Sequence, residues 1–193
     1  MRSRVSFSLL LWAFACLAFA QPDPSVVQKL RQGGYVLYLR HASTDFSQND
    51  SRMTSYDDCS TQRNLTDKGR EEARALGTQV KRLGIPIGAI YASPFCRTME
   101  TARLAFGEPK PTNEVRGGPS RPDDPARYEP LTKLLQTKPP PGKNAVIASH
   151  GNPFYALFGP PYLAEGEIAV VKPETNGRFN VVGRIRPEDW AAY

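Results

Sequence analysis

The sequence predicts an α/β domain of three layers, α/β/α, with a mainly parallel sheet and a late antiparallel hairpin. Three observations indicate this fold. Strand-like apolar runs alternate with helix-like segments along most of the chain, which is typical of parallel sheets whose strands are joined by helices. Some of these runs are apolar throughout, as expected for strands buried on both faces. Near the end, two strand-like runs flank Asn176-Gly177, a dipeptide typical of tight hairpin turns.

The elements of the first half can be assigned in order. A helix is predicted to begin with Ser25 in a capping box and to end at Gly33-Gly34. A continuous apolar strand follows over residues 35–39. Residues 42–64 are polar and have no clear period, and so long a loop is usually functional. Residues 66–83 carry apolar side chains at helical spacing, acidic residues near the start and basic residues near the end, which predicts a helix.

The second half continues the alternation. A strand is predicted over residues 87–92 and a helix over 94–106. Residues 108–130 are rich in proline, glycine and charge, and the sequence assigns little there. The remaining predicted elements are a helix over 126–137, a strand over 144–149, a short helix over 153–158 and hairpin strands over 168–172 and 179–182.

Residues 1–20 have the pattern of a secretory signal peptide. Two arginines precede the mostly apolar segment 7–19, and Ala18-Phe19-Ala20 matches a small-x-small cleavage site. The apolar run is short for a membrane span, and an uncleaved N-terminal anchor is the alternative. We expect cleavage after Ala20, one domain over residues 21–193, and a periplasmic or secreted protein. Such a protein meets the membrane only through the signal segment before cleavage.

Composition excludes some partners and leaves one covalent question open. The formal charge of +6 falls to +4 on cleavage, because Arg2 and Arg4 leave and no acidic residue does. No Lys/Arg tract with interleaved aromatic residues occurs, so nucleic-acid binding is not predicted. Cys59 and Cys96 survive cleavage, and in an oxidising compartment they form either a disulfide or two buried thiols. Acidic residues beside Cys59 lack the paired spacing of a metal site, so neither a metal nor another cofactor is predicted.

The two histidines of the chain each end an apolar strand. His41 follows the strand at 35–39 and is preceded by Arg40, and His150 follows the strand at 144–149. Because ligands bind outside the carboxyl ends of parallel strands, both imidazoles are expected in one pocket. Arg97 lies one helical turn after the second strand, and Asn152 is the predicted N-cap of the next helix. Arginines and a helix N-terminus suit a phosphate group.

Four motifs in these regions resemble those of the histidine phosphatase superfamily, and they occur in the family's order. They are Leu39-Arg40-His41-Ala42-Ser43-Thr44, Asn64-Leu65-Thr66-Asp67-Lys68-Gly69, Ser93-Pro94-Phe95-Cys96-Arg97-Thr98-Met99-Glu100-Thr101-Ala102, and Ser149-His150-Gly151-Asn152. The resemblance implies a phosphoglycerate mutase-like fold. The export signal and compact length look most like the exported branch that includes the lipopolysaccharide core heptose(II)-phosphate phosphatase.

The resemblance implies a metal-independent phosphatase that hydrolyses a phosphomonoester. His41 would be the nucleophile, neutral at the attacking nitrogen, and would form a phosphohistidine that water hydrolyses. Arg40, Arg97 and a protonated His150 would hold the phosphate, together with Asn152. The expected substrate is a small phosphorylated compound, with an envelope sugar phosphate among the candidates.

The proton donor for the leaving group is left open by the sequence. A carboxylic acid commonly supplies this proton, and Glu165, Glu114 and Asp45 are the candidates, with Glu165 preferred. Two other functions remain as alternatives: a phosphoglycerate-mutase-like phosphotransferase, and a non-catalytic binder of phosphorylated envelope molecules. Against the binder, binding alone does not require a nucleophile.

Overall fold

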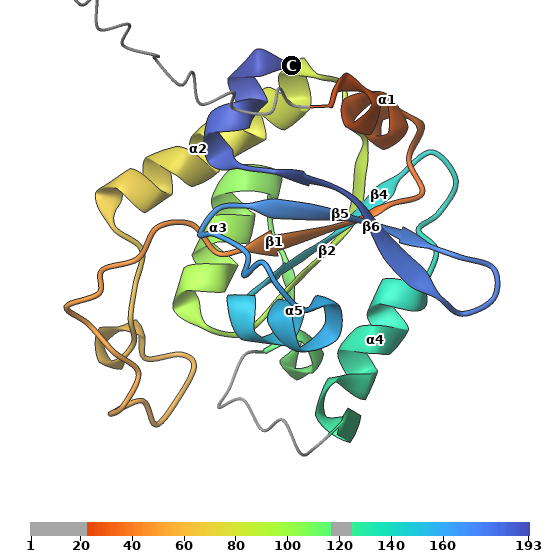
Figure 1. Cartoon of the computed structure of the whole chain (residues 1–193). Coiled ribbons are helices and arrows are strands. Elements are labelled where there is room, and N and C mark those ends of the chain that lie inside the picture. Colours follow the sequence, from red (N-terminus) through yellow and green to blue (C-terminus); the bar gives the residue numbers. More distant parts are fainter. Residues whose placement is uncertain (1–22, 117–124) are drawn as a thin grey trace, which may run out of the picture.

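The computed structural model describes residues 23–116 and 125–193 (Figure 1). The predicted signal peptide, residues 1–20, lies outside the described residues. A six-stranded sheet has the order β3-β2-β4-β1-β5-β6, in which β3, β2, β4 and β1 are parallel and β5 and β6 are antiparallel. The strands are β1 (Val36–Arg40), β2 (Ile87–Ala92), β3 (Lys110–Pro111), β4 (Asn144–Ser149), β5 (Ile168–Pro173) and β6 (Phe179–Ile185). The prediction of a mainly parallel sheet with a late hairpin is confirmed.

Helices cover both faces of this sheet. They are α1 (Pro24–Gln32), α2 (Asp67–Arg82), α3 (Cys96–Phe106), α4 (Glu129–Gln136) and α5 (Gly151–Phe158). Short 3-10 turns span Cys59–Thr61, Asn113–Val115, Pro125–Tyr128 and Pro187–Ala192. Within the two described ranges, no helix has the length and apolar character needed to cross a membrane.

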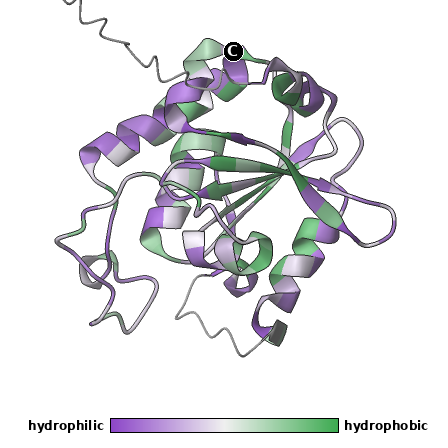
Figure 2. Ribbon diagram, viewed as in Figure 1, coloured by the Kyte–Doolittle hydropathy of each residue, from purple (hydrophilic) through white to green (hydrophobic). Residues whose placement is uncertain are grey.

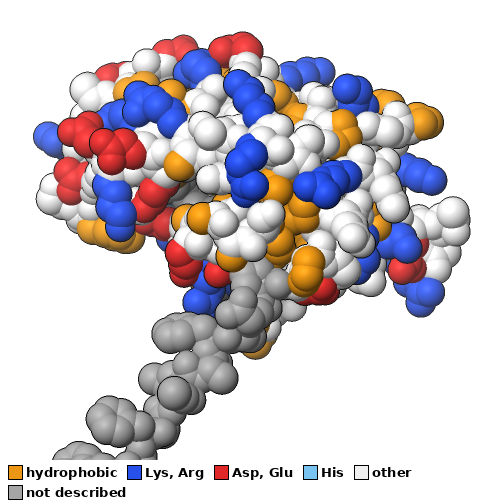
Figure 3. All heavy atoms as spheres, turned by 90° about the horizontal axis from the view of Figure 1, so that it is seen from above, with side chains coloured by type: hydrophobic (Ala, Val, Ile, Leu, Met, Phe, Trp, Pro, Cys, Tyr) orange, Lys and Arg blue, Asp and Glu red, His pale blue; other side chains and the backbone are white. Residues whose placement is uncertain are grey.

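The core divides into two layers because side chains alternate along the strands. In β1, Leu37 and Leu39 face α1, α2, α3 and the C-terminal turn, whereas Val36 and Tyr38 face α4 and α5 (Figure 1). All four side chains are almost fully buried, as a strand between two helical layers requires. In Figure 2 the central strands are largely hydrophobic, whereas the helix α2 that covers them carries many hydrophilic residues. On the face seen in Figure 3, basic and acidic side chains are intermixed.

Two predicted helix starts are wrong. The N-cap of α1 is Asp23, whose carboxylate accepts from the Ser25 backbone N–H at 2.9 Å, and Ser25 lies inside the helix. Pro24 occupies the first turn, which favours a cap just before it. The N-cap of α5 is His150, and Asn152 is the second residue of that helix. The chain therefore passes from β4 into α5 with a single residue between them.

Candidate active site

The carboxyl ends of β1 and β4 and the start of α3 meet around a cavity of about 630 Å³. The predicted nucleophile and the four residues predicted to bind the phosphate all line this cavity, whereas the predicted proton donor does not. Other residues that line the cavity come mainly from the loop after β1. Among the described residues, the lining consists of Arg40, His41, Gln48, Asn49, Asp50, Met53, Arg63, Phe95, Arg97, His150, Gly151, Asn152 and Tyr162.

His41 is held in a defined orientation at the end of β1. Its backbone N–H donates to the carbonyl of Ser149 on β4 at 3.1 Å. Its ring Nδ1 lies 3.0 Å from the Ala42 carbonyl oxygen, and because that partner only accepts, Nδ1 carries the proton in this hydrogen bond. Burial lowers the pKa of His41 to about 3, in spite of the hydrogen bond to Ala42. The imidazole is therefore neutral at physiological pH, with its lone pair on Nε2.

His150 faces His41, with the two ring centroids 5.5 Å apart. Its Nε2 is 2.8 Å from the Ser93 hydroxyl oxygen, and its backbone carbonyl accepts from the Tyr38 hydroxyl at 2.8 Å. Burial holds the pKa of His150 well below its usual value, and the neighbouring His41 acts in the same direction. Burial therefore favours the neutral form of His150 here, whereas the protonated form is predicted for its complex with a phosphate group.

Arg97 enters the cavity from the first turn of α3. Its Nη1 donates to the Asp50 carboxylate at 3.0 Å and to the Arg63 carbonyl at 3.2 Å. The guanidinium lies over the Phe95 ring, 4.4 Å from its centroid, and the edge of His150 packs against the same ring. The cation is therefore fixed beside His150 while the rest of its guanidinium, including a buried Nε without a partner, is not engaged within the described part of the chain.

Arg40 and Glu165 lie on the other side of the nucleophile. Arg40 donates to the Leu163 carbonyl at 2.7 Å and to Glu165 at 3.4 Å. The Glu165 carboxylate also accepts from the backbone N–H and the hydroxyl of Thr44, at 3.2 and 2.7 Å. One of its oxygens is 3.8 Å from Nδ1 of His41. Glu165 therefore faces the protonated nitrogen of His41, and it is absent from the cavity lining.

The other two candidate proton donors do not line the cavity either. The Asp45 carboxylate accepts from the backbone and hydroxyl of Ser47, at 2.9 and 2.7 Å. Glu114 is exposed in the 3-10 turn after β3. Among the described residues that line the cavity, the acidic one is Asp50. Sequence reasoning did not single out Asp50, because it lies in a polar loop that carries no motif at that position.

The start of α2 positions the segment that follows His41. Thr66 caps this helix by accepting from the Gly69 N–H at 3.0 Å, and its own N–H donates to the Ser43 carbonyl at 3.0 Å. A Cβ at Gly69 would lie only 2.1 Å from that carbonyl oxygen. The motif around Thr66 and Gly69 therefore allows a close approach between α2 and the nucleophile loop.

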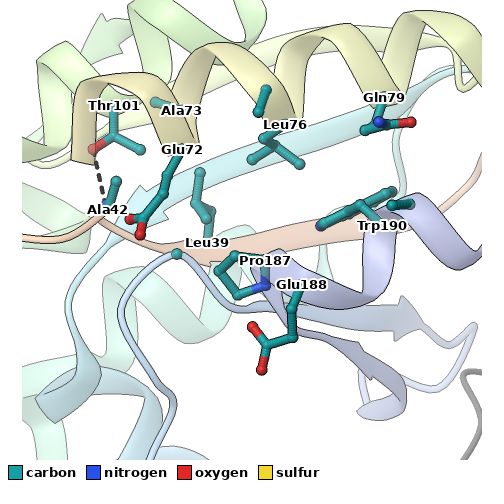
Figure 4. Close-up of a pocket in the computed structure, with 13 residues that line it drawn as sticks. Leu39, Ala42, Glu72, Ala73, Leu76, Gln79, Thr101, Pro187, Glu188 and Trp190 are labelled. Atoms are coloured by element: carbon teal, nitrogen blue, oxygen red, sulfur yellow. Dashed lines mark hydrogen bonds between the residues drawn. The ribbon is translucent and has the colours of Figure 1, made fainter. Parts of the chain in front are cut away.

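A second cavity, of about 270 Å³, lies between α2, the end of β1 and the C-terminal 3-10 turn (Figure 4). Its lining is mainly apolar and contains neither histidine. At its edge the Thr101 hydroxyl accepts from the Ala42 N–H at 3.1 Å, and the Glu72 carboxylate accepts from the Ser43 N–H at 3.2 Å. These bonds hold the same backbone that orients His41.

A disulfide joins the loop after β1 to the start of α3. Cys59 and Cys96 are bonded, with Cα atoms 5.8 Å apart, so the structure has the bridge rather than two thiols. Beside it, the Gln62 side-chain oxygen accepts from the Cys96 N–H at 3.0 Å, while the Gln62 amide donates to the Tyr56 carbonyl at 3.0 Å. The loop that carries Asp50 is thereby anchored next to Arg97.

Comparisons with known proteins found a similar sequence family and similar folds. Residues 36–116 match the model of the histidine phosphatase superfamily (branch 1). No curated protein matches the chain.

Among solved structures, the fold is similar to that of a protein histidine phosphatase SixA complexed with tungstate (TM-score 0.56, 18% identity, 80% of this chain and 98% of that chain). It is also similar to a SixA protein of Agrobacterium tumefaciens (TM-score 0.54, 17% identity, 80% of this chain and 99% of that chain). A third similar structure is a phosphoserine phosphatase mutant of Entamoeba histolytica in complex with phosphoserine (TM-score 0.53, 14% identity, 80% of this chain and 98% of that chain). Residues 36–116, which contain Arg40, His41 and Arg97, thus resemble the histidine phosphatase superfamily, branch 1, and the fold of the structure is similar to the folds of these solved structures.

Proposed function

We propose that the protein is a phosphatase that hydrolyses a phosphomonoester through a phosphohistidine on His41, without a metal ion. One observation carries the proposal: a buried neutral imidazole, held through Nδ1 by the Ala42 carbonyl, lines a cavity together with Arg40, Arg97 and His150. A nucleophilic nitrogen needs a free lone pair and a fixed direction of attack. Both conditions are met at Nε2 of His41.

The reaction has two steps. In the first, Nε2 of His41 forms a bond to phosphorus while the bond to the ester oxygen breaks, and that oxygen leaves with a proton. In the second, water attacks phosphorus, the bond to Nε2 breaks, and inorganic phosphate is released. Charge is spread over the three equatorial oxygens in both transition states. Arg40 and Arg97 are the cations that stabilise it, with the backbone N–H groups at the start of α5 beside them.

His150 completes this anion site. In this structure its pKa is held low by burial and by neighbouring positive charge. A phosphate dianion within a few ångströms favours the charged form of an imidazole. We therefore expect His150 to take up a proton when a phosphorylated substrate binds, so that substrate binding consumes a proton near neutral pH.

For Glu165 we propose a positioning role in place of the general-acid role that the sequence favoured. Its carboxylate accepts two hydrogen bonds from Thr44 and faces Nδ1, on the side of the ring away from the attacking nitrogen. The proton transfer is assigned to Asp50, the carboxylate of the described cavity lining. Asp50 would protonate the leaving oxygen in the first step and accept a proton from water in the second.

The nature of the leaving group and the site of action remain predictions. Export to the periplasm or outside the cell is supported by the pattern of residues 1–20 and by the disulfide, because disulfides persist mainly in oxidising compartments. An envelope sugar phosphate, as in the exported branch that the sequence resembles, is consistent with that location.

The direct kinetic test is the His41→Ala variant, assayed with p-nitrophenyl phosphate. Because the nucleophile is removed, kcat/KM is expected to fall by about 10³-fold or more. Arg52→Met, an exposed change on the same loop, serves as the control and is expected to retain activity. A folded His41→Ala protein that keeps more than about a tenth of the wild-type kcat/KM would refute the role of His41 as nucleophile.

A further inference from the structure

Three arginines line the cavity, and they differ in how the protein compensates their charge. Arg40 is paired with Glu165, and Arg97 is paired with Asp50. The guanidinium of Arg63 makes no hydrogen bond or ion pair to any residue in 23–116 or 125–193, and its Nε is buried without a partner. Arg63 as a whole is half-buried, but a buried hydrogen-bond donor such as its Nε–H is unfavourable unless an acceptor satisfies it. Arg63 is therefore the cation that is ready for a ligand.

The position of Arg63 is fixed although its guanidinium is unpaired. Its backbone N–H donates to the Asp50 carboxylate at 2.8 Å, and its carbonyl accepts from Arg97. Its guanidinium lies over the Phe46 ring, 5.0 Å from the centroid, a contact that orients a cation without neutralising it. These contacts place an oriented positive charge at the cavity and leave its donors available.

The cavity has room for more than the reacting phosphate. Its volume of about 630 Å³ is that of sites that hold whole small molecules. Arg40, Arg97 and His150 line the same cavity as His41 and suffice for one phosphate group, as proposed above. If they hold the reacting group, the charge of Arg63 is still uncompensated beside it.

We propose that Arg63 binds a second anionic group of the substrate. This inference rests on the proposed phosphatase function and narrows its substrate class to phosphomonoesters that carry another phosphoryl group or a carboxylate. The guanidinium forms charge-assisted, bidentate hydrogen bonds to that second group. The guanidinium keeps its contact with the exposed ring of Phe46.

The test compares substrates that differ only in the second charge. Ortho-, meta- and para-(carboxymethyl)phenyl phosphate are each assayed beside the corresponding methyl ester, with wild type, Arg63→Met, Arg63→Lys and Arg52→Met. For at least one isomer, wild type is expected to favour the acid over the ester by about tenfold or more in kcat/KM, the size of a charge-assisted hydrogen bond. Arg63→Met abolishes this preference and changes kcat/KM for the ester by less than about threefold. Arg63→Lys keeps part of it, and Arg52→Met keeps all of it.

Two results would overturn the proposal. One is an equal loss of kcat/KM for the acid and for the ester in Arg63→Met, which would assign Arg63 to the reacting phosphate. The other is a wild type without any preference across the three isomers. Calorimetric binding of pyrophosphate and of inorganic phosphate separates this proposal from the phosphatase function. Even if no ester is hydrolysed, wild type should prefer pyrophosphate, and Arg63→Met should lose that preference. Equal ratios in the two proteins would refute the second anion site.

Discussion

The two buried histidines make the stability of the protein depend on pH in a calculable way. Burial lowers the pKa of His41 from 6.5 to about 3, so between these values the unfolded chain binds a proton that the folded protein does not. Stability is then fully present above pH 6.5 and decreases as the pH falls toward 3. At pH 5, which is 1.5 units below the unfolded value, the loss from His41 is about 2 kcal/mol at 1.36 kcal/mol per unit. His150 acts with the same sign.

Urea unfolding at pH 8 and pH 5 measures this effect. The chain contains only two histidines, so few other groups titrate in that interval. His41→Gln cannot bind the proton in either state, and its loss of stability between the two pH values should be smaller than that of wild type by about 2 kcal/mol. Arg52→Met should match wild type. Equal losses in wild type and His41→Gln would refute the inference that His41 is buried in its neutral form.

Two further predictions concern the loop and the proton donor. Gly69→Ala should lower the free energy of unfolding by about 1–3 kcal/mol and reduce kcat/KM, because its Cβ would meet the Ser43 carbonyl oxygen at 2.1 Å; in Gly88→Ala the nearest contact is the Lys143 side chain at 3.2 Å, and activity should persist. Unchanged activity in Gly69→Ala would contradict the supporting role of α2. Asp50→Asn should reduce hydrolysis of an alkyl phosphate by about 10²-fold. With p-nitrophenyl phosphate it should change the burst of nitrophenolate, which reports the first step, much less, because nitrophenolate leaves without a proton. Glu165→Gln should lower the rate of the first step to the same extent with both substrates. If Glu165→Gln instead spares p-nitrophenyl phosphate and Asp50→Asn does not, the general acid is Glu165.

The residues around the phosphate site could be predicted because local patterns mark them. Continuous apolar runs identify β1 and β4, and the carboxyl ends of neighbouring parallel strands meet at one edge of a sheet. His41 and His150 follow from this rule alone, and they are 5.5 Å apart between ring centroids in the structure. The position of Arg97 can also be predicted, because a strand pattern precedes it and Arg97 lies in the first turn of the helix that follows.

Asp50 and Arg63 could not be predicted as a pair from the sequence. Both lie in residues 42–64, where no hydrophobic period constrains the backbone. Their positions depend on contacts between distant residues, including the Cys59–Cys96 disulfide and the hydrogen bond between Gln62 and Cys96. Such contacts leave no local pattern that a reading of the sequence can detect.

The wrong helix caps and the missed strand have local physical causes. Asp23 and Ser25 are both good N-cap residues, and the choice depends on Pro24, which occupies the first turn of α1. The sequence predicts that the helix begins at Pro153, but Pro153 is the third residue of α5. A proline is tolerated throughout the first turn, because N–H groups there have no partner in the helix. The strand β3 has only two residues, too few to show an alternating pattern.

Trapping the covalent intermediate tests the central claim most directly. Wild type is mixed with a ³²P-labelled aryl phosphate, quenched within one turnover and digested, and the labelled peptide is identified. The label should be acid-labile and alkali-stable, as a phosphoramidate is, and it should lie on the peptide that contains His41. An alkali-labile acyl phosphate on Asp50 or Glu165, or turnover without any protein-bound label, would contradict catalysis through His41.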